Sequence, residues 1–477
     1  MSFFGIQYLP ESITPEVASH PNIKTRRYAI VGAGAAGLCA IKYLKQAGAA
    51  HIDCFEIGTK IGGLWCYNND NGLSSAYRTL HINTARTFTR FSHMDLPKDV
   101  QAFPHHTDMY QYFLDYAEKF DLVRHVRFKS KVINIGHAPG YTGESPKWLV
   151  EVEGRQPGTY DAVIVCTGHL SRPRDLPEFT KFSGEYMHVH HYREPEHFAG
   201  KRVCVIGGAN SAFDVCADVC VNAKKTVMVA RSGVIISPKT MCGVPYGDIM
   251  LHLNRRWVPN WVRRRAGLFI TWLMHGDMTK LGFKKQTRWQ HTTSNGTLVS
   301  HIQYRRVTVK QGIVRIEGNR IFFVDGTSDE FDSMVAATGY DLEFPFIAKE
   351  LVPTKDSFAE LYKRIVRPGQ NGLYFLGYVN TTVALNIMFE HQMKWILSVD
   401  SGKSQLPPEA EMWKDIAAKR AWIVERYGDS ERYSMEEPHL VYFPELERSS
   451  RESETRNRQR GSPSIHRRAA VEAFGGD

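Results

Sequence analysis

Two glycine-rich turns in this chain are each followed, at the same spacing, by residues of opposite charge. Glu56 stands 24 residues after Gly32, and Arg231 stands 24 residues after Gly207. In a strand–turn–helix–strand unit this offset falls at the tip of the second strand, beside the adenosine ribose of a bound dinucleotide. A carboxylate there accepts hydrogen bonds from ribose hydroxyls, whereas an arginine pairs with the 2′-phosphate that NADP carries. The spacing predicts an FAD site and an NADPH site.

The first turn has the complete glycine pattern of such a site. An apolar strand over 28–31 precedes it, a second strand over 51–55 follows the intervening helix, and it reads Gly32-Ala33-Gly34-Ala35-Ala36-Gly37. The first glycine permits the tight turn, the second lets backbone approach a pyrophosphate, and the third allows close helix–strand packing. Helix-start amides then favour the phosphate charge.

The second turn is degenerate, because Ala209 and Ala212 replace its second and third glycines. Alanine is an accepted variant at the third position, whereas at the middle position its methyl group predicts looser or displaced pyrophosphate binding. Strands over 202–206 and 226–230 and a helix over 210–222 complete the pattern. The alternative is a structural βαβ unit that binds no nucleotide.

The composition is that of a globular chain larger than one ordinary domain, with 477 residues, 43% hydrophobic and 23% charged. The first 25 residues are polar and contain prolines, which argues against a secretory leader. The longest apolar run, over 266–274, is too short to cross a bilayer. We therefore expect no transmembrane span.

The eight cysteines show no C-x-x-C motif, which argues against a dithiol-relay flavoenzyme. Cys216 and Cys220 are one helical turn apart, a spacing that suits packing better than a disulfide. No Cys/His spacing indicates a zinc site, so we expect no metal. These features favour a reduced, cytoplasmic protein.

Basic residues gather in two places and contribute to the net charge of +10. Residues 447–468 hold seven arginines and three glutamates without an aromatic residue, which predicts a disordered tail over 446–477. Arg255, Arg256 and 263–265 are interleaved with Trp257 and Trp261. Ordinary packing of an amphipathic segment is the favoured interpretation there, and weak contact with a membrane surface is the alternative.

Five further motifs occur in order after the first turn. The first two are Gly62-Gly63-Leu64-Trp65 and the stretch from Ser75-Ala76-Tyr77 to His81-Ile82-Asn83-Thr84-Ala85-Arg86. The other three are Phe182-x-Gly184-x-x-x-His188-x-x-x-Tyr192, Ala337-Thr338-Gly339-Tyr340, and Glu390-His391-Gln392 with Trp395. Over roughly residues 26–405 the chain resembles the flavin-containing monooxygenases. The motif from Phe182 to Tyr192 looks like the fingerprint of that family. The resemblance implies FAD and NADPH as cofactors and molecular oxygen as a co-substrate.

The resemblance also implies a catalytic role for Asn83. In this family, reduced flavin reacts with oxygen to form a 4a-hydroperoxide, which decays to hydrogen peroxide unless water is excluded and the peroxide is hydrogen-bonded. A neutral amide can hold NADP⁺ and the peroxide without delivering a proton early. The alternative is a loop asparagine that bonds its own backbone.

Four other residues receive roles at this stage. His188, at the junction between the two units, is expected to hydrogen-bond backbone rather than act as a general base. Tyr192 stands where Baeyer–Villiger relatives usually carry Trp, which favours oxygenation of a heteroatom. Arg231 with Ser232 forms the expected 2′-phosphate clamp, and spacing alone assigns nothing to Lys239. The residues expected to contact the cofactors are Gly32, Ala33, Gly34, Ala35, Ala36, Gly37, Glu56, Leu64, Trp65, Ile82, Asn83, Thr84, Gly207, Ala209, Asn210, Ser211, Asp214, Arg231 and Ser232.

The predicted fold is α/β, with two Rossmann-like dinucleotide-binding domains and the NADP domain inserted in the FAD domain. Buried strands over 160–167 and 332–338 precede Gly168 and Gly339, which mark the two linkers. The boundaries follow: 1–25, an N-terminal arm; 26–170 and 333–445, the FAD domain; 171–332, the NADP domain; 446–477, the tail. The tryptophans of 240–300 are expected to pack over the interface between the domains.

The predicted function is NADPH-dependent transfer of one oxygen atom to a nucleophilic nitrogen or sulfur of a small organic substrate. Three alternatives stay open: a Baeyer–Villiger enzyme, an amino-acid N-hydroxylase, and an NADPH–flavin oxidase or reductase. Oxygen and the substrate are the expected partners, and nucleic acid is not. A homodimer and a weak peripheral membrane contact are left open.

Overall fold

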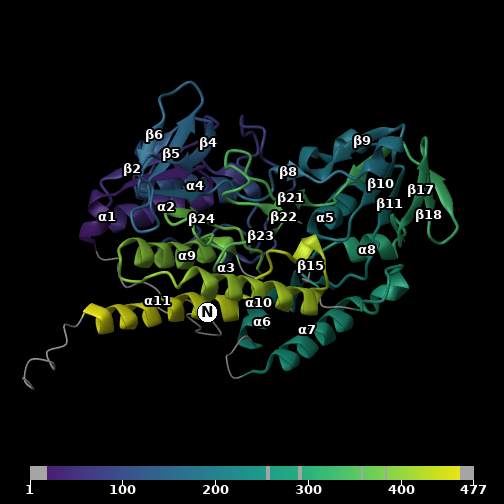
Figure 1. Ribbon diagram of the computed structural model, residues 1–477. Coiled ribbons are helices and arrows are strands. Elements are labelled where there is room, and N and C mark those ends of the chain that lie inside the picture. The colour runs from purple at the N-terminus through teal and green to yellow at the C-terminus, as the bar shows by residue number, and fades with distance from the viewer. Residues whose placement is uncertain are drawn as a thin grey trace, which may run out of the picture.

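Two five-stranded parallel sheets organise the chain. The computed structural model describes residues 19–253, 258–287, 290, 293–355, 358–381 and 384–461. The first sheet has the order β24-β7-β1-β2-β3 and the second has the order β16-β11-β10-β20-β9. Figure 1 shows the first sheet on one side of the molecule and the second on the other. The strand bounds are β1 Arg27–Val31, β2 His51–Phe55, β3 Val126–Arg127, β7 Ala162–Val165, β24 Leu373–Phe375, β9 Glu185–His188, β10 Arg202–Ile206, β11 Lys225–Val229, β16 Val307–Lys310 and β20 Ser333–Ala336.

The second sheet is inserted in the first. β1, β2, β3 and β7 precede it in the chain, whereas β24 follows it and pairs in parallel with β7. The predicted returning strands are confirmed, because β7 pairs with β1 and β20 pairs with β10. Both are buried at every position, as expected for parallel strands covered on both faces.

Each sheet carries a helix that starts at its glycine turn. These are α2 (Ala35–Gln46) in the first unit and α5 (Asn210–Val219) in the second. α2 is buried on nearly all sides because α9 (Leu385–Asp400) packs against it. The other helices are α1 Pro21–Thr25, α3 Arg86–Thr89, α4 His106–Lys119, α6 Tyr246–Leu253, α7 Asn260–His275, α8 Leu298–Gln303, α10 Glu409–Tyr427 and α11 His439–Gly461.

Two small antiparallel sheets extend the two units, with the orders β4-β5-β6 and β17-β18-β19. Their bounds are β4 Val132–His137, β5 Trp148–Val152, β6 Gly158–Tyr160, β17 Ile313–Glu317, β18 Arg320–Phe323 and β19 Ser328–Glu330. The remaining strands are short pairs, among them β12 (Ile236–Ser237) with β15 (Thr293–Ser294) and β21 (Tyr340–Asp341) with β8 (Arg172–Pro173).

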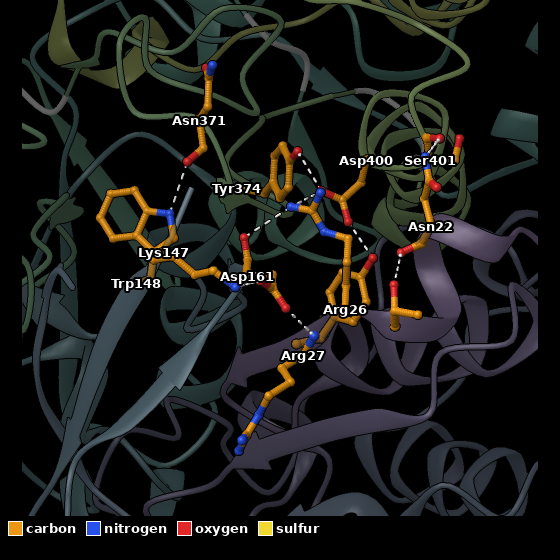
Figure 2. A network of polar contacts seen from close by, with 12 residues as sticks. Asn22, Arg26, Arg27, Lys147, Trp148, Asp161, Asn371, Tyr374, Asp400 and Ser401 are labelled. Atoms are coloured by element: carbon orange, nitrogen blue, oxygen red, sulfur yellow. Dashed lines mark hydrogen bonds and ion pairs between the residues drawn. The ribbon is translucent and has the colours of Figure 1, made fainter. Parts of the chain in front are cut away.

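A buried polar network joins the start of the first sheet to the end of α9 (Figure 2). The Arg26 guanidinium lies 3.0 Å from the Asp400 carboxylate and donates to the backbone carbonyl of Asp161 at 3.1 Å. The hydroxyl groups of Tyr28 and Tyr374 donate to the same Asp400 carboxylate. Burial raises the pKa of Asp400, and Arg26 opposes that rise. The network fixes the end of the sheet opposite the glycine turn.

The C-terminal part of the chain continues as helix beyond the predicted start of the tail at residue 446. α11 runs to Gly461 because its first turns are anchored: Leu446 is 2% exposed, and Trp395 of α9 donates its indole N–H to Ser449. Figure 1 shows α10 and α11 running along α9. Residues 462–477 lie outside the described residues, as do residues 1–18 of the predicted N-terminal arm.

Candidate active site

The first glycine turn is as tight as its sequence predicts. A Cβ on Gly32 would lie 2.9 Å from the carbonyl oxygen of Cys166, and a Cβ on Gly37 would lie 2.0 Å from the carbonyl oxygen of Gly32. α2 therefore starts directly against the turn. Its N-cap, Gly34, makes no side-chain cap and its first turn has no acidic residue. The helix-start amides are thus available to an anion such as a pyrophosphate.

Glu56 closes this turn from the end of β2. Its carboxylate accepts hydrogen bonds from the backbone N–H groups of Ala33 at 2.8 Å and Gly58 at 3.0 Å, and the residue is 3% exposed. Its two oxygens retain further acceptor capacity. This is the strand-end position at which a carboxylate meets ribose hydroxyls in dinucleotide sites.

The segment after β2 folds back over the turn. Gly62 donates its N–H to the carbonyl oxygen of Ala33 at 3.0 Å. A Cβ on Gly63 would lie 3.1 Å from the Cα of Gly34, so two glycine backbones pass each other closely. Leu64 and Trp65 continue this segment and are half-buried beside the turn. The arrangement predicts a narrow, backbone-lined cradle.

The second turn repeats this geometry, with an alanine in place of the third glycine. A Cβ on Gly207 would lie 2.6 Å from the carbonyl oxygen of Ala337, the residue directly after β20. Ala212 occupies the third-glycine position, and its methyl group would lie 3.0 Å from that Cβ. Ala209 is the N-cap of α5 and makes no side-chain cap. Asn210 begins the helix and accepts a hydrogen bond from the Ser294 N–H at 3.3 Å.

The strand register corrects one inference from spacing. The last residue pair of β1 and β2 includes Phe55, and that of β10 and β11 includes Val229. Glu56 follows Phe55, and Ala230 follows Val229. The N–H of Glu56 donates to β3 at 3.0 Å, and the N–H of Ala230 donates to β16 at 2.8 Å, so these two residues occupy equivalent positions. Arg231 therefore lies one residue beyond the position that Glu56 occupies. Equal spacing along the chain does not make the two charged residues structurally equivalent.

Arg231 is exposed and makes no ion pair or hydrogen bond within the described part of the chain. Ser232 beside it is exposed as well. A second cation reaches the same turn from the C-terminal segment, where the guanidinium of Arg432 donates to the carbonyl oxygen of Gly208 at 3.4 Å. The second turn thus carries free positive charge, as a phosphate site requires.

Asn83 is held by a lysine of the second unit. The ammonium group of Lys239 donates to Asn83 Oδ1 at 2.6 Å and to the carbonyl oxygen of Ile82 at 3.3 Å. The same ammonium lies 4.7 Å from the centre of the Phe103 ring. Burial lowers the pKa of Lys239, and the carboxylate of Asp214 opposes that effect. Asn83, Ile82 and Thr84 are all half-buried.

Two carboxylates of α5 anchor the segment that leads to Asn83. Asp214 accepts hydrogen bonds from the Tyr77 hydroxyl at 2.9 Å and the Asn295 amide at 2.8 Å. Asp218 accepts one from Thr79 at 2.8 Å. Tyr77 is buried in the core of the second unit. The structure therefore places residues around 77 against the second unit, whereas their sequence position predicts the first.

The fingerprint motif forms structural contacts at the junction. His188 donates its Nε2–H to the carbonyl oxygen of Gly339 at 3.1 Å, and its Nδ1 accepts from the His190 N–H at 3.1 Å. Burial lowers the pKa of His188 to about 4, so the ring is neutral near pH 7. The expectation of a backbone-bonded histidine is confirmed. Tyr192 is fully buried, and its hydroxyl donates to Asp218.

The donor groups fit two dinucleotides. Each turn offers uncapped helix-start amides, one beside a buried carboxylate and the other beside two exposed guanidinium groups, those of Arg231 and Arg432. Among the residues that the structure describes, no group of three or more His, Cys, Asp or Glu side chains is arranged to hold a metal ion. Two parallel sheets with these turns define an α/β protein whose two turns each fit a dinucleotide.

Comparison with known proteins gives the family. The model described as flavin-binding monooxygenase-like matches residues 25–451. Flavin-containing monooxygenase 5 of Rattus norvegicus is 31% identical, over 88% of this chain and 82% of the relative. Dimethylaniline monooxygenase (N-oxide-forming) 2 of Cavia porcellus is 29% identical with the same coverage. The structure of S-allyl-L-cysteine S-oxygenase from Allium sativum shares the fold, with a TM-score of 0.67, 24% identity, and coverage of 92% and 94%.

The chain belongs to the flavin-binding monooxygenase-like family. It is an oxygen-dependent flavin monooxygenase with FAD and NADPH as its cofactors. The fold predicted from the sequence is confirmed, with two parallel α/β units and the second inserted in the first.

Sequence reasoning missed the contacts that join the two units. Lys239, Asp218 and Arg432 lie far along the chain from their partners in the other unit, and no local motif marks them. One usable signal was the four-residue spacing of Asp214 and Asp218, which places two carboxylates on one face of α5.

Proposed function

We propose that this monooxygenase transfers one oxygen atom to a soft nucleophilic nitrogen or sulfur of a small organic substrate. The observation that carries the proposal is Asn83, a neutral amide held at the contact between the two units by Lys239. One relative is named for N-oxide formation, which supports nitrogen as an acceptor. A sulfide is a soft nucleophile of the same kind.

Each unit has a separate task in this proposal. The FAD unit comprises residues 26–170 and 337–445, where α2 receives the pyrophosphate and Glu56 the ribose. The NADP unit comprises residues 171–336, where α5 receives the second pyrophosphate and Arg231 the 2′-phosphate. The boundary predicted between residues 332 and 333 is wrong by one strand, because β20 (Ser333–Ala336) pairs with β10 in the second sheet. The boundary at residue 445 follows the sequence, and α11 extends beyond it.

Asn83 performs its task without moving a proton. When bound, FAD reduced by NADPH supplies the activation of molecular oxygen. The amide of Asn83 donates hydrogen bonds toward the reacting atoms and cannot release a proton near neutral pH. His188 is neutral and bonded to backbone on both ring nitrogens, so we assign it to the junction and not to proton transfer. A soft nucleophile needs no general base for its own activation.

The test is a product analysis with three probes. The holoenzyme is supplied with NADPH and ¹⁸O₂, and separately with N,N-dimethylaniline, methyl phenyl sulfide or cyclohexanone. We expect an N-oxide or a sulfoxide that carries one ¹⁸O atom, formed in proportion to NADPH oxidised. Turnover of the first two probes with no reaction of the ketone supports the proposal.

The alternatives give different results in the same experiment, once ornithine is added as a fourth probe. Lactone from cyclohexanone, with neither N-oxide nor sulfoxide, would identify a Baeyer–Villiger enzyme. Reaction of a free amino acid such as ornithine, with no other product, would identify an N-hydroxylase. If the amount of hydrogen peroxide formed equals the amount of NADPH oxidised with every probe, the protein is an oxidase.

We also propose that α7 contacts an anionic membrane surface. Trp261, Phe269 and Trp272 are 62%, 60% and 58% exposed, and helical spacing brings them to one side of α7 with the exposed Arg265. The Arg265 guanidinium lies 5.7 Å from the Trp261 ring centre. Aromatic rings with neighbouring cations suit a headgroup interface. None of the helices in the described residues is long and apolar enough to cross a bilayer.

This surface differs from the expectation that the tryptophans cover the interface between the domains. Trp257 and Trp289 lie outside the described residues, as do Arg255 and Arg256, and the two tryptophans of α7 face solvent. A flotation assay with vesicles of 30% phosphatidylserine should recover the wild-type protein, and recovery should fall for Trp261→Ser/Trp272→Ser. Tyr304→Ser, which removes another exposed aromatic ring of the same unit, is the matched control.

Self-association is the other outcome of this test. If the wild-type protein does not float but sediments as a dimer that the double variant abolishes, α7 is a homodimer surface and the membrane proposal fails. The cytoplasm is the compartment we propose, because all eight cysteines are free and seven of them are buried.

A further inference from the structure

The side-chain amide of Asn83 has one orientation in this structure because the ammonium group of Lys239 can only donate hydrogen bonds. An ammonium group has three donors and no acceptor, so it can face only the oxygen end of a carboxamide. Lys239 Nζ lies 2.6 Å from Asn83 Oδ1, a short charge-assisted distance. The nitrogen end of the amide therefore points away from Lys239, and Asn83 offers only N–H donors on that side.

Lys239 is itself held from several directions. Its ammonium also donates to the carbonyl oxygen of Ile82 at 3.3 Å and lies over the Phe103 ring at 4.7 Å. Its backbone carbonyl accepts from the Tyr246 N–H at 2.9 Å. The buried carboxylate of Asp214 supplies the opposite charge that favours the protonated lysine. The contacts with Asn83, Ile82 and Phe103 fix the ammonium end of the side chain, and the hydrogen bond from Tyr246 fixes its backbone.

Lys239 and Asn83 belong to different units. Lys239 follows β12 in the inserted unit, whereas Asn83 precedes α3 in the segment between β2 and β3. Asp214 lies on α5, the helix that starts at the second glycine turn. The orientation of the Asn83 amide thus depends on how the unit that carries α5 meets the segment that carries Asn83.

We propose that Lys239 is a positioning residue of the monooxygenase reaction: it fixes the amide of Asn83 so that its N–H donors face the reacting atoms, and it does so only when the two units are in contact. The proposal rests on the proposed role of Asn83. It predicts that loss of the Lys239 ammonium reproduces the loss of Asn83 itself, because an amide free to turn presents its oxygen as often as its nitrogen.

The test is a double-mutant cycle with Lys239→Met and Asn83→Ala. The first readout is the fraction of NADPH oxidised that ends as hydrogen peroxide in the presence of a sulfide. The second is the dissociation constant of NADP⁺ for the oxidised holoenzyme, which needs no turnover. We expect each single variant to raise the peroxide fraction several-fold and to weaken NADP⁺ by about tenfold, the loss of one charge-assisted hydrogen bond. The double variant should resemble Asn83→Ala alone.

Two further variants separate positioning from general damage. Lys239→Gln keeps an N–H donor for Asn83 Oδ1 without the charge and should recover most of the coupling. Lys280→Met, an exposed lysine of the same unit, should match the wild type in both readouts. Thermal unfolding of each holoenzyme shows whether a variant has lost its fold.

The outcomes distinguish the two hypotheses. If Asn83→Ala leaves both readouts unchanged, the proposed role of Asn83 fails and the inference fails with it. If Asn83→Ala uncouples the enzyme but Lys239→Met does not, only the positioning role is overturned. Additive effects in the double variant, or no recovery with Lys239→Gln, would show that Lys239 does not act through Asn83.

Discussion

The two glycine turns have the same backbone arrangement, but the charged residue that follows each turn differs. One is buried and hydrogen-bonded to its turn, and the other is exposed and makes no ion pair or hydrogen bond among the described residues. In both, the first glycine lies against the backbone just beyond the neighbouring strand, at Cys166 in the first unit and Ala337 in the second. In the first, Glu56 is buried and its carboxylate binds the turn itself. In the second, apolar Ala230 takes the place of Glu56, and the charge moves to the exposed Arg231.

This difference matches what each cofactor has to do. A turn tied to a buried carboxylate is preorganised and loses little freedom when a nucleotide binds, which favours a cofactor that stays. A turn with exposed cations attracts phosphates from solution and lets them leave, which suits a nucleotide that must exchange at every cycle. The comparison predicts a graded set of effects from substitutions at equivalent positions.

The largest effect is expected for Gly37→Ala. The new Cβ would lie 2.0 Å from the carbonyl oxygen of Gly32, so α2 must move away from its turn. We expect a loss of more than about 3 kcal/mol of stability and a protein purified with little flavin. The ratio of flavin to protein absorbance and the thermal midpoint measure both. Ala212→Gly at the equivalent position should cost only about 1 kcal/mol, and equal losses would contradict the comparison.

Glu56→Ala should have the next largest effect. It leaves the backbone N–H groups of Ala33 and Gly58 without their charged acceptor and removes the partner proposed for the FAD ribose. We expect FAD affinity to fall by roughly 2–4 kcal/mol, measured by titration of the apoprotein with FAD. Glu317→Ala, an exposed carboxylate of β17, is the control. An unchanged FAD affinity would refute the assignment of Glu56.

Arg231→Ala should affect the binding of NADPH and little else. The free guanidinium makes no contact that the fold needs, so we expect stability to change little. The Michaelis constant for NADPH should rise by the equivalent of roughly 1.5–3 kcal/mol, whereas that for NADH, which lacks the 2′-phosphate, should stay near its wild-type value. Equal increases for both nucleotides would contradict the clamp.

The smallest effect is expected for Ala209→Gly, which restores the middle glycine of the second turn. Removal of the methyl group admits the pyrophosphate, and glycine is a better N-cap than alanine. We expect NADP⁺ to bind more tightly by about 0.5–1 kcal/mol, seen by titration of the oxidised holoenzyme. Weaker binding would show that the alanine is fitted to this site.

The fold could be predicted because its signals are local. A glycine turn, the apolar strand before it and the amphipathic helix after it lie within some 30 residues, and the predicted strand over 202–206 matches β10 at both ends. The insertion of the second unit in the first could be predicted from two apolar runs, over 160–167 and 332–338, each of which ends at a glycine. Hydrophobic periodicity and turn chemistry act over such distances, so the residues alone reveal them.

The contacts between the two units could not be predicted in the same way. Lys239 reaches Asn83, and Tyr77 reaches Asp214, from positions more than 130 residues apart, and a sequence records no signal for such a pair. The place of Arg231 one residue beyond Glu56 depends on strand register, which spacing alone does not fix. The helical start of the predicted tail depends on burial of Leu446 against distant parts of the chain.

The pairing of β24 with β7 also sets an order for assembly during synthesis. Leu373 pairs with Val163 across the whole inserted unit, so the flavin-side sheet lacks an edge strand until the ribosome has passed residue 375. The five strands of the inserted sheet are complete once residue 336 has emerged. Because domains fold as units and distant pairings close slowly, the inserted unit is expected to form first. A nascent chain stalled at the length at which residue 336 has just left the ribosomal exit tunnel should then already resist protease in its second half while its first half stays open to cleavage.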